Sequence, residues 1–321
     1  MKKRNVLIVT NSYDEHAHLV IPEIQKLGGA IYRIDTDRLP EFFTISAYID
    51  PFSIEFTTPV GKIASSDIFS VWVRRPTQNF PEPHSAEQKF IKQETLEFIR
   101  NLYILLSSHS LVIDSPEKVY FADHKLKQLI KCKEFGLSIP RTLVTSSPEE
   151  AIAFYKKNKK NIIVKSLNIP MAQYGEDWFT TFTSKVEGDV DFSLVRSSPT
   201  FLQENIEKKT ELRITIIGKK LFAVEFDSQS LPYTKIDWRR VQEKLLEIPH
   251  RVVKLPLQIE KKLRSLLDYY GLNFGAIDMA RTPDDEYVFF ELNPAGQFLW
   301  LDDVTDLNLA QEMAKFLLGM Q

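Results

Sequence analysis

The chain has 321 residues, of which 43% are apolar and 26% are charged, values typical of a globular protein with a core large enough for two or three subdomains. Its formal net charge of −2 excludes a strongly basic chain, so we expect neither nucleic acid nor a membrane as a partner. The single cysteine, Cys132, excludes an internal disulfide and a cysteine-rich zinc site. No apolar run is long enough for a signal core or a membrane span, so we expect a cytoplasmic protein.

The first part of the chain favours a parallel sheet. Residues 6–10 form an apolar run typical of a buried strand, residues 17–27 have a helical pattern, and residues 30–34 predict a second strand. This order is a βαβ opening. Because Asn11-Ser12-Tyr13-Asp14 stands where a glycine-rich loop would lie, a dinucleotide-binding fold is not supported.

A strand predicted over residues 69–73 ends in two adjacent arginines, Arg74 and Arg75, followed by Pro76. Paired arginines at a strand end can hold an anion through charge-assisted hydrogen bonds. The alternative is a pair of solvated surface charges. The same segment contains further predicted elements, which are strands over residues 42–49 and 53–58 and a helix over residues 87–106.

The turn Ser115-Pro116 opens a second segment, which carries lysines in two different settings. A helix predicted over residues 121–134 holds Lys125 and Lys127, and a short apolar strand ends at Lys165. A lysine on a strand is usually a surface residue, so none of these lysines indicates a site by itself.

The last segment predicts antiparallel strands. Residues 201–206 form a strand that becomes polar, and a hairpin over residues 211–227 alternates so that Glu211 and Arg213 share one face. An ordinary cross-strand ion pair is the alternative for those two residues. A helix over residues 256–270 has an apolar stripe and ends at a glycine. The pattern as a whole is α/β followed by α+β.

A second hairpin is predicted where two apolar runs of strand character flank Pro283-Asp284-Asp285-Glu286, a turn-forming cluster. If those four residues form the loop, Thr282 lies opposite Tyr287. The same register then places Asp278 directly opposite Glu291.

Asp278, Glu291 and Asn293 would project together from this hairpin, because opposed residues share a face and so do residues two apart on one strand. Ala276 and Ala280 are small neighbours that leave room for a ligand. Hard oxygen ligands of this kind suit Mg²⁺ bound with nucleotide phosphates. A hairpin with a solvated polar face is the alternative.

From Pro116 to the C-terminus, the order of these features resembles the ATP-grasp superfamily. The resemblance implies that ATP and Mg²⁺ are used. In that family two lysines hold the nucleotide phosphates, and they match Lys125, with Lys127 close by, and Lys165. A hinge segment accepts adenine through its backbone, and the residues that match it are Gln203, Glu204, Asn205 and Ile206.

The remaining family positions lie on the two hairpins. A carboxylate that binds the ribose hydroxyls matches Glu211. An arginine that reaches the transferred phosphate or the acceptor matches Arg213. The metal ligands match the three residues that the register brings together, Asp278, Glu291 and Asn293.

A narrower resemblance covers nearly the whole chain. The stretches Val71-Trp72-Val73-Arg74-Arg75-Pro76, Lys235-Ile236-Asp237-Trp238-Arg239 and Glu291-Leu292-Asn293-Pro294-Ala295-Gly296-Gln297-Phe298-Leu299-Trp300 are similar to the graspetide synthetases, of which the microviridin ligases are the best known. One departure is Phe298, where tryptophan is more common.

This resemblance implies an ADP-forming ligase that joins Asp or Glu side chains of a ribosomally made precursor peptide to its own Thr or Ser hydroxyls or Lys amines, as ω-esters or ω-amides. It implies a precursor with a leader and an acidic core, and a homodimer. Phosphorylating a carboxylate makes it an electrophile, and that transfer needs positive charge and positioning. Arg213 and Arg239 are the catalytic candidates, Asp237 is a candidate base, and Arg74 and Arg75 are candidates for holding the substrate acid.

Two other functions remain open from the residues. One is a ligase acting on a small molecule, an amino acid or a protein tail, and the other is a nucleotide-binding regulatory module without turnover. We expect an N-terminal pre-ATP-grasp domain over residues 1–115, a central subdomain over 116–203 and a catalytic subdomain with an antiparallel sheet over 204–321.

Overall fold

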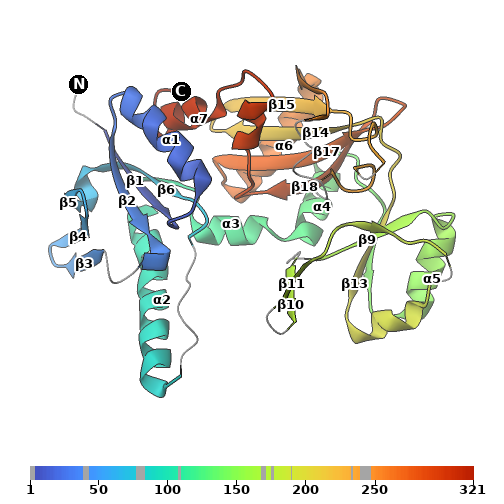
Figure 1. Cartoon of the computed structure of the whole chain (residues 1–321), viewed down its shortest axis with the longest axis horizontal. Helices are drawn as coiled ribbons and strands as arrows, with labels where there is room; N and C mark the ends of the chain where they lie inside the picture. Colours follow the sequence, from blue (N-terminus) through green and yellow to red (C-terminus); the bar gives the residue numbers. More distant parts are fainter. Residues whose placement is uncertain are drawn as a thin grey trace.

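The computed structural model describes residues 4–38, 43–76, 84–107, 110–167, 171–174, 177–188, 190–232, 234–238 and 247–321, with the backbone alone for 171–174 and 177–180. Figure 1 shows a sheet near the N-terminus, a second sheet beside it that is built by the C-terminal third of the chain, and a smaller sheet below the second one. The expected mixture of α/β and α+β architecture is confirmed.

The N-terminal part comprises β1 (Asn5–Thr10), α1 (Glu15–Lys26), β2 (Ala30–Asp35), β3 (Thr44–Ile49), β4 (Phe52–Thr58), β5 (Gly61–Ala64), β6 (Ile68–Val73), α2 (Ala86–Ser107) and β7 (Leu111–Ile113). Strands β2-β1-β6-β7 form a wholly parallel sheet, so the predicted βαβ opening is confirmed. Val6 and Ile8 pack on α1 and on the last helix, α7 (Leu309–Leu317), whereas Leu7 and Val9 pack on α2 and β4. Burial on both faces explains why this strand is apolar at every position.

The middle part comprises α3 (Pro116–Ala122), α4 (Lys125–Glu134), β8 (Thr142–Thr145), α5 (Pro148–Lys157), β9 (Ile162–Lys165), β10 (Met171–Tyr174), β11 (Asp177–Thr180), β12 (Ser184–Lys185) and β13 (Thr200–Glu204). Strands β12-β9-β13-β8 form an antiparallel sheet, and β10 pairs with β11 as a separate hairpin. The sheet has its own small core with α5.

The prediction of one continuous helix over residues 121–134 is wrong. Two helices, α3 and α4, occupy this region, and they are separated at Asp123-His124. The Gln128 side chain donates hydrogen bonds to the carbonyl oxygens of Ala122, at 2.6 Å, and Leu292, at 2.8 Å. It thereby satisfies a carbonyl that the end of α3 leaves without a helical partner. The break makes Lys125 the first residue of α4.

The C-terminal part comprises β14 (Thr210–Ile217), β15 (Lys220–Phe226), β16 (His250–Val253), α6 (Leu257–Tyr270), β17 (Phe274–Arg281), β18 (Tyr287–Asn293) and α7. Strands β16-β15-β14-β17-β18 form an antiparallel sheet. Along β14, Leu212 and Ile214 pack in the same core as α4 and α6, whereas Glu211 and Arg213 alternate with them and lie on the opposite face. The predicted common face of those two charged residues is confirmed.

The register of the β17–β18 hairpin is partly as predicted. Asp278 lies opposite Glu291, as expected, but Arg281 and not Thr282 pairs with Tyr287. An extra residue, Phe290, shifts the ladder between the turn and the acidic pair. Such a bulge places two residues against one on the partner strand and re-aims a side chain. Phe290 and Glu291 therefore both line the cavity described next, although they are adjacent.

Candidate functional site

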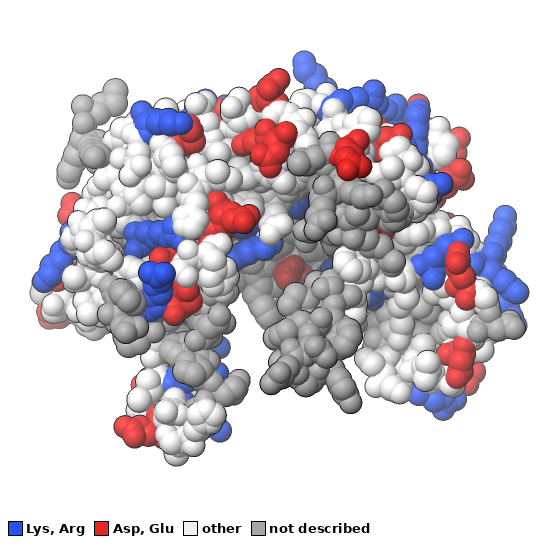
Figure 2. Space-filling view, viewed as in Figure 1, with Lys and Arg blue, Asp and Glu red and all other residues white. Residues whose placement is uncertain are grey.

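A cavity of about 500 Å³ lies between the middle sheet and the polar face of the C-terminal sheet. Figure 2 shows this side of the molecule hollowed at its centre, with acidic and basic atoms at the bottom of the hollow. The predicted site residues that line the cavity are Arg75, Lys125, Lys165, Gln203, Glu204, Asn205, Ile206, Glu211, Asp237, Asp278, Glu291 and Asn293. The other predicted ones are Arg74 and Arg213, which lie behind its wall, and Arg239, which falls outside the described residues.

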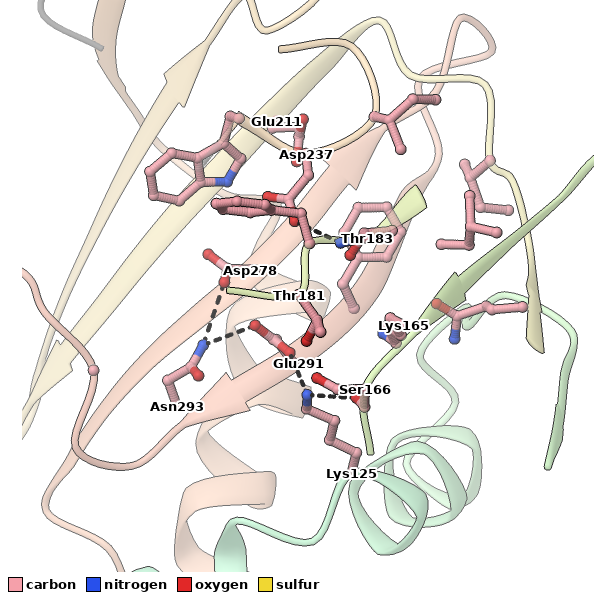
Figure 3. Close-up of a pocket in the computed structure, with 18 of the residues that line it drawn as sticks. Lys125, Lys165, Ser166, Thr181, Thr183, Glu211, Asp237, Asp278, Glu291 and Asn293 are labelled. Carbon is pink, nitrogen blue, oxygen red and sulfur yellow. Dashed lines mark hydrogen bonds and ion pairs between the residues drawn. The ribbon is translucent and has the colours of Figure 1, made fainter. Parts of the chain in front are cut away.

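The acidic wall of the cavity consists of Asp278, Glu291 and Asn293. The Asn293 Nδ2 atom lies 3.3 Å from Asp278 Oδ2 and 3.4 Å from Glu291 Oε1, so the amide points between the two carboxylates (Figure 3). A half-turn of the amide brings its oxygen to the same point. Two carboxylates and an amide oxygen fit Mg²⁺. Within the described ranges no cluster of three His, Cys, Asp or Glu side chains is placed to hold a metal, so this mixed set is the candidate.

Lys125 and Lys165 face the acidic wall from the middle part of the chain (Figure 3). Lys125 Nζ donates to the carbonyl oxygen of Ser166 at 3.1 Å and lies 3.7 Å from Glu291 Oε2. Lys127 points elsewhere, since its Nζ lies 3.2 Å from the centroid of the Phe121 ring. The structure thus places Lys125, and not Lys127, in the cavity.

Asp123 is a cavity residue that the sequence analysis did not single out. Burial raises the pKa of Asp123, and the nearby Glu291 carboxylate adds to the rise while the charge of Lys125 opposes it. Its position depends on the break between α3 and α4, which has no glycine or proline to announce it. The sequence therefore offered no local signal for this residue.

The segment of residues 203–206 is held along the cavity by its side chains. The pairs are Gln203 Nε2 with Thr142 Oγ1 at 2.9 Å, Arg141 with the Glu204 carboxylate at 2.7 and 2.9 Å, and Asn205 Nδ2 with Asn161 Oδ1 at 2.9 Å. Since these side chains bind the middle sheet, the backbone of the segment is fixed relative to β9.

Glu211 is paired with Lys208, a second cavity residue that the sequence analysis missed. Lys208 Nζ lies 2.7 Å from Glu211 Oε1, and both side chains are almost fully buried. The same Nζ donates to the Ile236 carbonyl oxygen at 3.3 Å. Lys208 thus ties β14 to the segment that carries Asp237. The three-residue spacing between Lys208 and Glu211 was the signal in the sequence that could have indicated this ion pair.

Asp237 lies between the C-terminal and middle parts of the chain. Its Oδ2 atom accepts a hydrogen bond from the Thr183 backbone N–H at 3.1 Å (Figure 3). The neighbouring Trp238 packs on Phe226 and Trp300, with ring centroids 5.5 Å away in both cases. This packing fixes the segment at one wall of the cavity.

Arg213 lies beside the acidic wall, opposite Asp278 on the neighbouring strand β14. Its Nη1 donates to Asp278 Oδ1 at 2.7 Å and its Nη2 donates to the Gln297 carbonyl oxygen at 2.6 Å. Arg213 is 5% exposed. It therefore orients Asp278 and holds the loop that follows β18 against the sheet.

The two adjacent arginines after β6 point to different places. Arg75 lines the main cavity, whereas Arg74 lines a separate cavity of about 10 Å³. Both donate to the carbonyl oxygen of Ala295, Arg75 from Nε at 2.9 Å and Arg74 from Nη1. Arg75 has a φ of 46°, a left-handed conformation that turns the chain at this point.

Burial, together with the charges of Arg75 and Arg213, lowers the pKa of Arg74 to about 9, against the opposing charge of Asp14. Among the described residues, the Nε and Nη2 atoms of Arg74 have no hydrogen-bond partner. His16 lies near Arg74, Arg75 and Arg213. Its Nε2 accepts a hydrogen bond from the Phe298 N–H at 3.1 Å. Burial, together with the nearby arginine charges, lowers the pKa of His16 to about 3, so the imidazole is neutral.

No helix in the described part of the chain is long and apolar enough to cross a bilayer. Among curated proteins, none matches the chain. A family model described as the MvdD pre-ATP grasp domain matches residues 5–119.

Solved structures match over nearly the full length. A RiPP-associated ATP-grasp ligase of Chryseobacterium gregarium, in complex with ADP and a leader and core peptide, is 31% identical over 99% of this chain and 97% of its own, with a TM-score of 0.88. The macrocyclase MdnC of Microcystis aeruginosa MRC, bound with its precursor peptide MdnA, is 31% identical over 98% and 99%, with a TM-score of 0.83. The macrocyclase MdnB of the same organism is 28% identical over 98% and 99%, with a TM-score of 0.79. By its sequence identity and its fold, the chain belongs to the RiPP-associated ATP-grasp ligases.

Proposed function

We propose that this chain is an ADP-forming ligase that activates Asp or Glu side chains of a precursor peptide with ATP and couples them to hydroxyls or amines of the same peptide. The observation that carries the proposal is the meeting, in one cavity, of the acidic wall of Asp278, Glu291 and Asn293 with Lys125 and Lys165. The similar ligases that were solved with ADP or with precursor peptides support the same reaction.

In this proposal the nucleotide lies along residues 203–206, with Glu211 at the ribose and the two lysines at the phosphates. The acidic wall would hold Mg²⁺, which would supply charge neutralisation for the phosphates. Such an active site accelerates phosphoryl transfer by positioning and charge.

The substrate carboxylate attacks the terminal phosphorus, which gives an acyl phosphate and ADP. A hydroxyl or amine then attacks the acyl carbon, and inorganic phosphate leaves. Arg75 is proposed to hold the substrate acid. Arg213 is proposed to act on the transferring phosphate by orienting Asp278, as well as by its own charge, and Arg239 is proposed as a further catalytic group. Asp237 is proposed to take the proton of the attacking group.

We propose further that residues 1–115, 116–203 and 204–321 act as the pre-ATP-grasp, central and catalytic units, and that the protein works as a homodimer. The boundary near residue 115 follows from the turn Ser115-Pro116, whereas the roles of the three units and the homodimer follow from the family resemblance.

The test is ATP turnover in the presence of an acidic candidate precursor peptide. We expect one ADP, one phosphate and the loss of one water from the peptide for each bond formed. Mild alkaline treatment restores the lost mass from an ester and leaves an amide unchanged. Formation of AMP and pyrophosphate would contradict the acyl-phosphate step, and hydrolysis without change of any acidic peptide would contradict the peptide substrate.

The nucleotide part has its own test. Replacing Lys165 with Met should weaken ATP binding about tenfold or more, because an ammonium on bound phosphate acts in the ground state. Calorimetry measures the affinity. Lys127→Met, which changes a lysine outside the cavity, is the matched control, and equal affinities for both variants would contradict the assignment.

A further inference from the structure

The loop that follows β18, residues 294–298, packs directly on the acidic wall. A Cβ atom at Gly296 would lie 2.7 Å from the Ala276 Cβ and 2.9 Å from the Asn293 Cβ, so no side chain fits there. The Gly296 N–H also donates to the Asn293 carbonyl oxygen at 3.1 Å. Because the loop and a candidate Mg²⁺ ligand are in direct contact, a shift of the loop would also move the candidate metal site.

One peptide group of this loop is held from both sides. Its carbonyl oxygen, which belongs to Gln297, accepts a hydrogen bond from Arg213 Nη2 at 2.6 Å. Its N–H, which belongs to Phe298, donates to His16 Nε2 at 3.1 Å. The group is trans. A peptide group is planar, so its N–H and C=O point to opposite sides of one rigid unit. Fixing the N–H therefore fixes the direction of the carbonyl group that Arg213 binds.

The N-terminal part of the chain fixes the position of His16. The residue lies in the first turn of α1 and is 8% exposed. Its backbone N–H donates at 3.1 Å to the carboxylate of Asp14, the N-cap residue of the helix. Its ring centroid lies 5.1 Å from that of Phe298, which in turn lies 5.0 Å from that of Phe274 on β17. The imidazole is thus packed between α1 and the C-terminal sheet.

The hydrogen bonds require a neutral imidazole with its proton on Nδ1. The Nε2 atom accepts from the Phe298 N–H and lies 3.5 Å from the Leu299 nitrogen, so it carries a lone pair. The Nδ1 atom lies 3.9 Å from Asp14 Oδ1, whose charge favours a proton on that nitrogen. Burial and the nearby arginine charges lower the pKa of His16 to about 3, which preserves the neutral form at neutral pH.

Arg213 connects this peptide group to the acidic wall. Its planar guanidinium binds the Gln297 carbonyl oxygen through one terminal nitrogen and Asp278 Oδ1, at 2.7 Å, through the other. The second oxygen of Asp278 faces Asn293 in the cavity (Figure 3). A change in the direction of the Gln297 carbonyl group would therefore turn the guanidinium and, with it, the Asp278 carboxylate.

We propose that His16 is a positioning residue of the ligase, which aligns Asp278 for Mg²⁺ through the peptide group of residues 297 and 298 and through Arg213. His16 has this role only if Asp278 is a metal ligand, so the inference rests on the proposed function. The N-terminal part of the chain then contributes to phosphoryl transfer through a residue that does not contact the nucleotide.

Two amide variants test the hydrogen-bond acceptor. His16→Gln places a side-chain oxygen near the position of Nε2, whereas His16→Asn is one bond too short to reach the Phe298 N–H. His16→Asn should lower kcat about tenfold, which is typical when a group that orients a metal ligand is lost, and His16→Gln should keep most of the rate. His18→Asn, at an exposed histidine of the same helix, is the matched control. Equal rates for the two His16 variants, or rates that simply follow their melting temperatures, would overturn the proposal.

A double-mutant cycle tests the path through Arg213. If His16 acts through Arg213, His16→Asn should slow an Arg213→Ala protein by less than about twofold, because the contact that it aligns is already lost. Independent action of the two residues would give additive losses, with a further decrease of about tenfold. Additive losses would overturn the path.

A binding measurement needs neither peptide nor turnover. Calorimetry gives the affinity for ADP with and without Mg²⁺. His16→Asn should reduce the gain in affinity that Mg²⁺ provides about tenfold and leave the affinity without Mg²⁺ unchanged, whereas His16→Gln should retain the gain. A gain of full size in His16→Asn would overturn the role of His16 and leave the proposed function intact. If Mg²⁺ gave the unchanged protein no gain, the proposed function would fail, and the role of His16 with it.

Discussion

The β17–β18 hairpin and the end of β6 both carry two like charges, but only the hairpin brings both of them to the cavity. On the hairpin, Asp278 and Glu291 lie opposite each other in the ladder and share one wall. After β6, Arg74 and Arg75 are adjacent in the sequence and line two different cavities. Opposed strand residues share a face, whereas neighbours along a chain diverge. Register is therefore a better guide to a shared site than adjacency.

The largest expected effect is on the hairpin. Glu291→Ala or Asp278→Ala should abolish coupling, because removing a ligand of the candidate Mg²⁺ site removes charge stabilisation on the order of several kcal/mol. The readout is ADP formation with peptide present. Glu286→Ala, an exposed acid in the turn of the same hairpin, should keep full activity. Full activity of the Glu291 variant would contradict the role of the acidic wall.

Arg213 links the two regions, since it binds both Asp278 and the loop that receives Arg74 and Arg75. Arg213→Ala should lower kcat about a hundredfold, as is typical when one preorganised donor is lost. Arg213→Lys should recover only part of the rate, because an ammonium cannot reproduce the planar fork that reaches Asp278 and Gln297 together. A lowered melting temperature with unchanged kcat would instead show a purely structural role.

The adjacent arginines should give different phenotypes. Arg75→Ala should slow peptide coupling about tenfold and leave the melting temperature unchanged, since a lost charge-assisted contact costs about 1.5–3 kcal/mol. Arg74→Ala should instead lower the free energy of unfolding by about 2 kcal/mol, because it opens a void at a buried position. Identical phenotypes for the two variants would contradict the different roles of Arg74 and Arg75.

The smallest effect at neutral pH concerns the protonation of His16. Its pKa is near 3 in the folded protein and near its usual value when unfolded, so only the unfolded chain gains the proton below about pH 6.5. Stability from this group is present above that pH and is lost as the pH falls, by up to about 1.4 kcal/mol per pH unit. His16→Gln should reduce the pH dependence of the unfolding free energy between pH 7 and 5, as measured by urea unfolding. His84→Gln, at an exposed histidine, should leave the pH dependence of the unfolding free energy unchanged. An unchanged pH dependence in the His16 variant as well would contradict the role of His16.

Local patterns determined much of this site. The sequence places Asp278 opposite Glu291 and puts Glu211 and Arg213 on one face, because strand alternation and turn-forming residues act over short distances. The residues that the family order matches to the lysines, the hinge and the carboxylates also all line the cavity. The bulge at Phe290 shows that the register near the turn was nevertheless one residue off.

Long-range packing decided the rest. At the break between α3 and α4, Gln128 donates both to the Ala122 carbonyl oxygen and to that of Leu292, more than 160 residues away, and no glycine or proline announces the break or the placement of Asp123. The separation of Arg74 from Arg75 depends on where the loop after β18 offers the Ala295 carbonyl. A sequence specifies which residues alternate within an element. The packing of distant elements then decides which of those residues are buried and which line the cavity. Burial and hydrogen-bond partners come from the neighbours that this packing supplies.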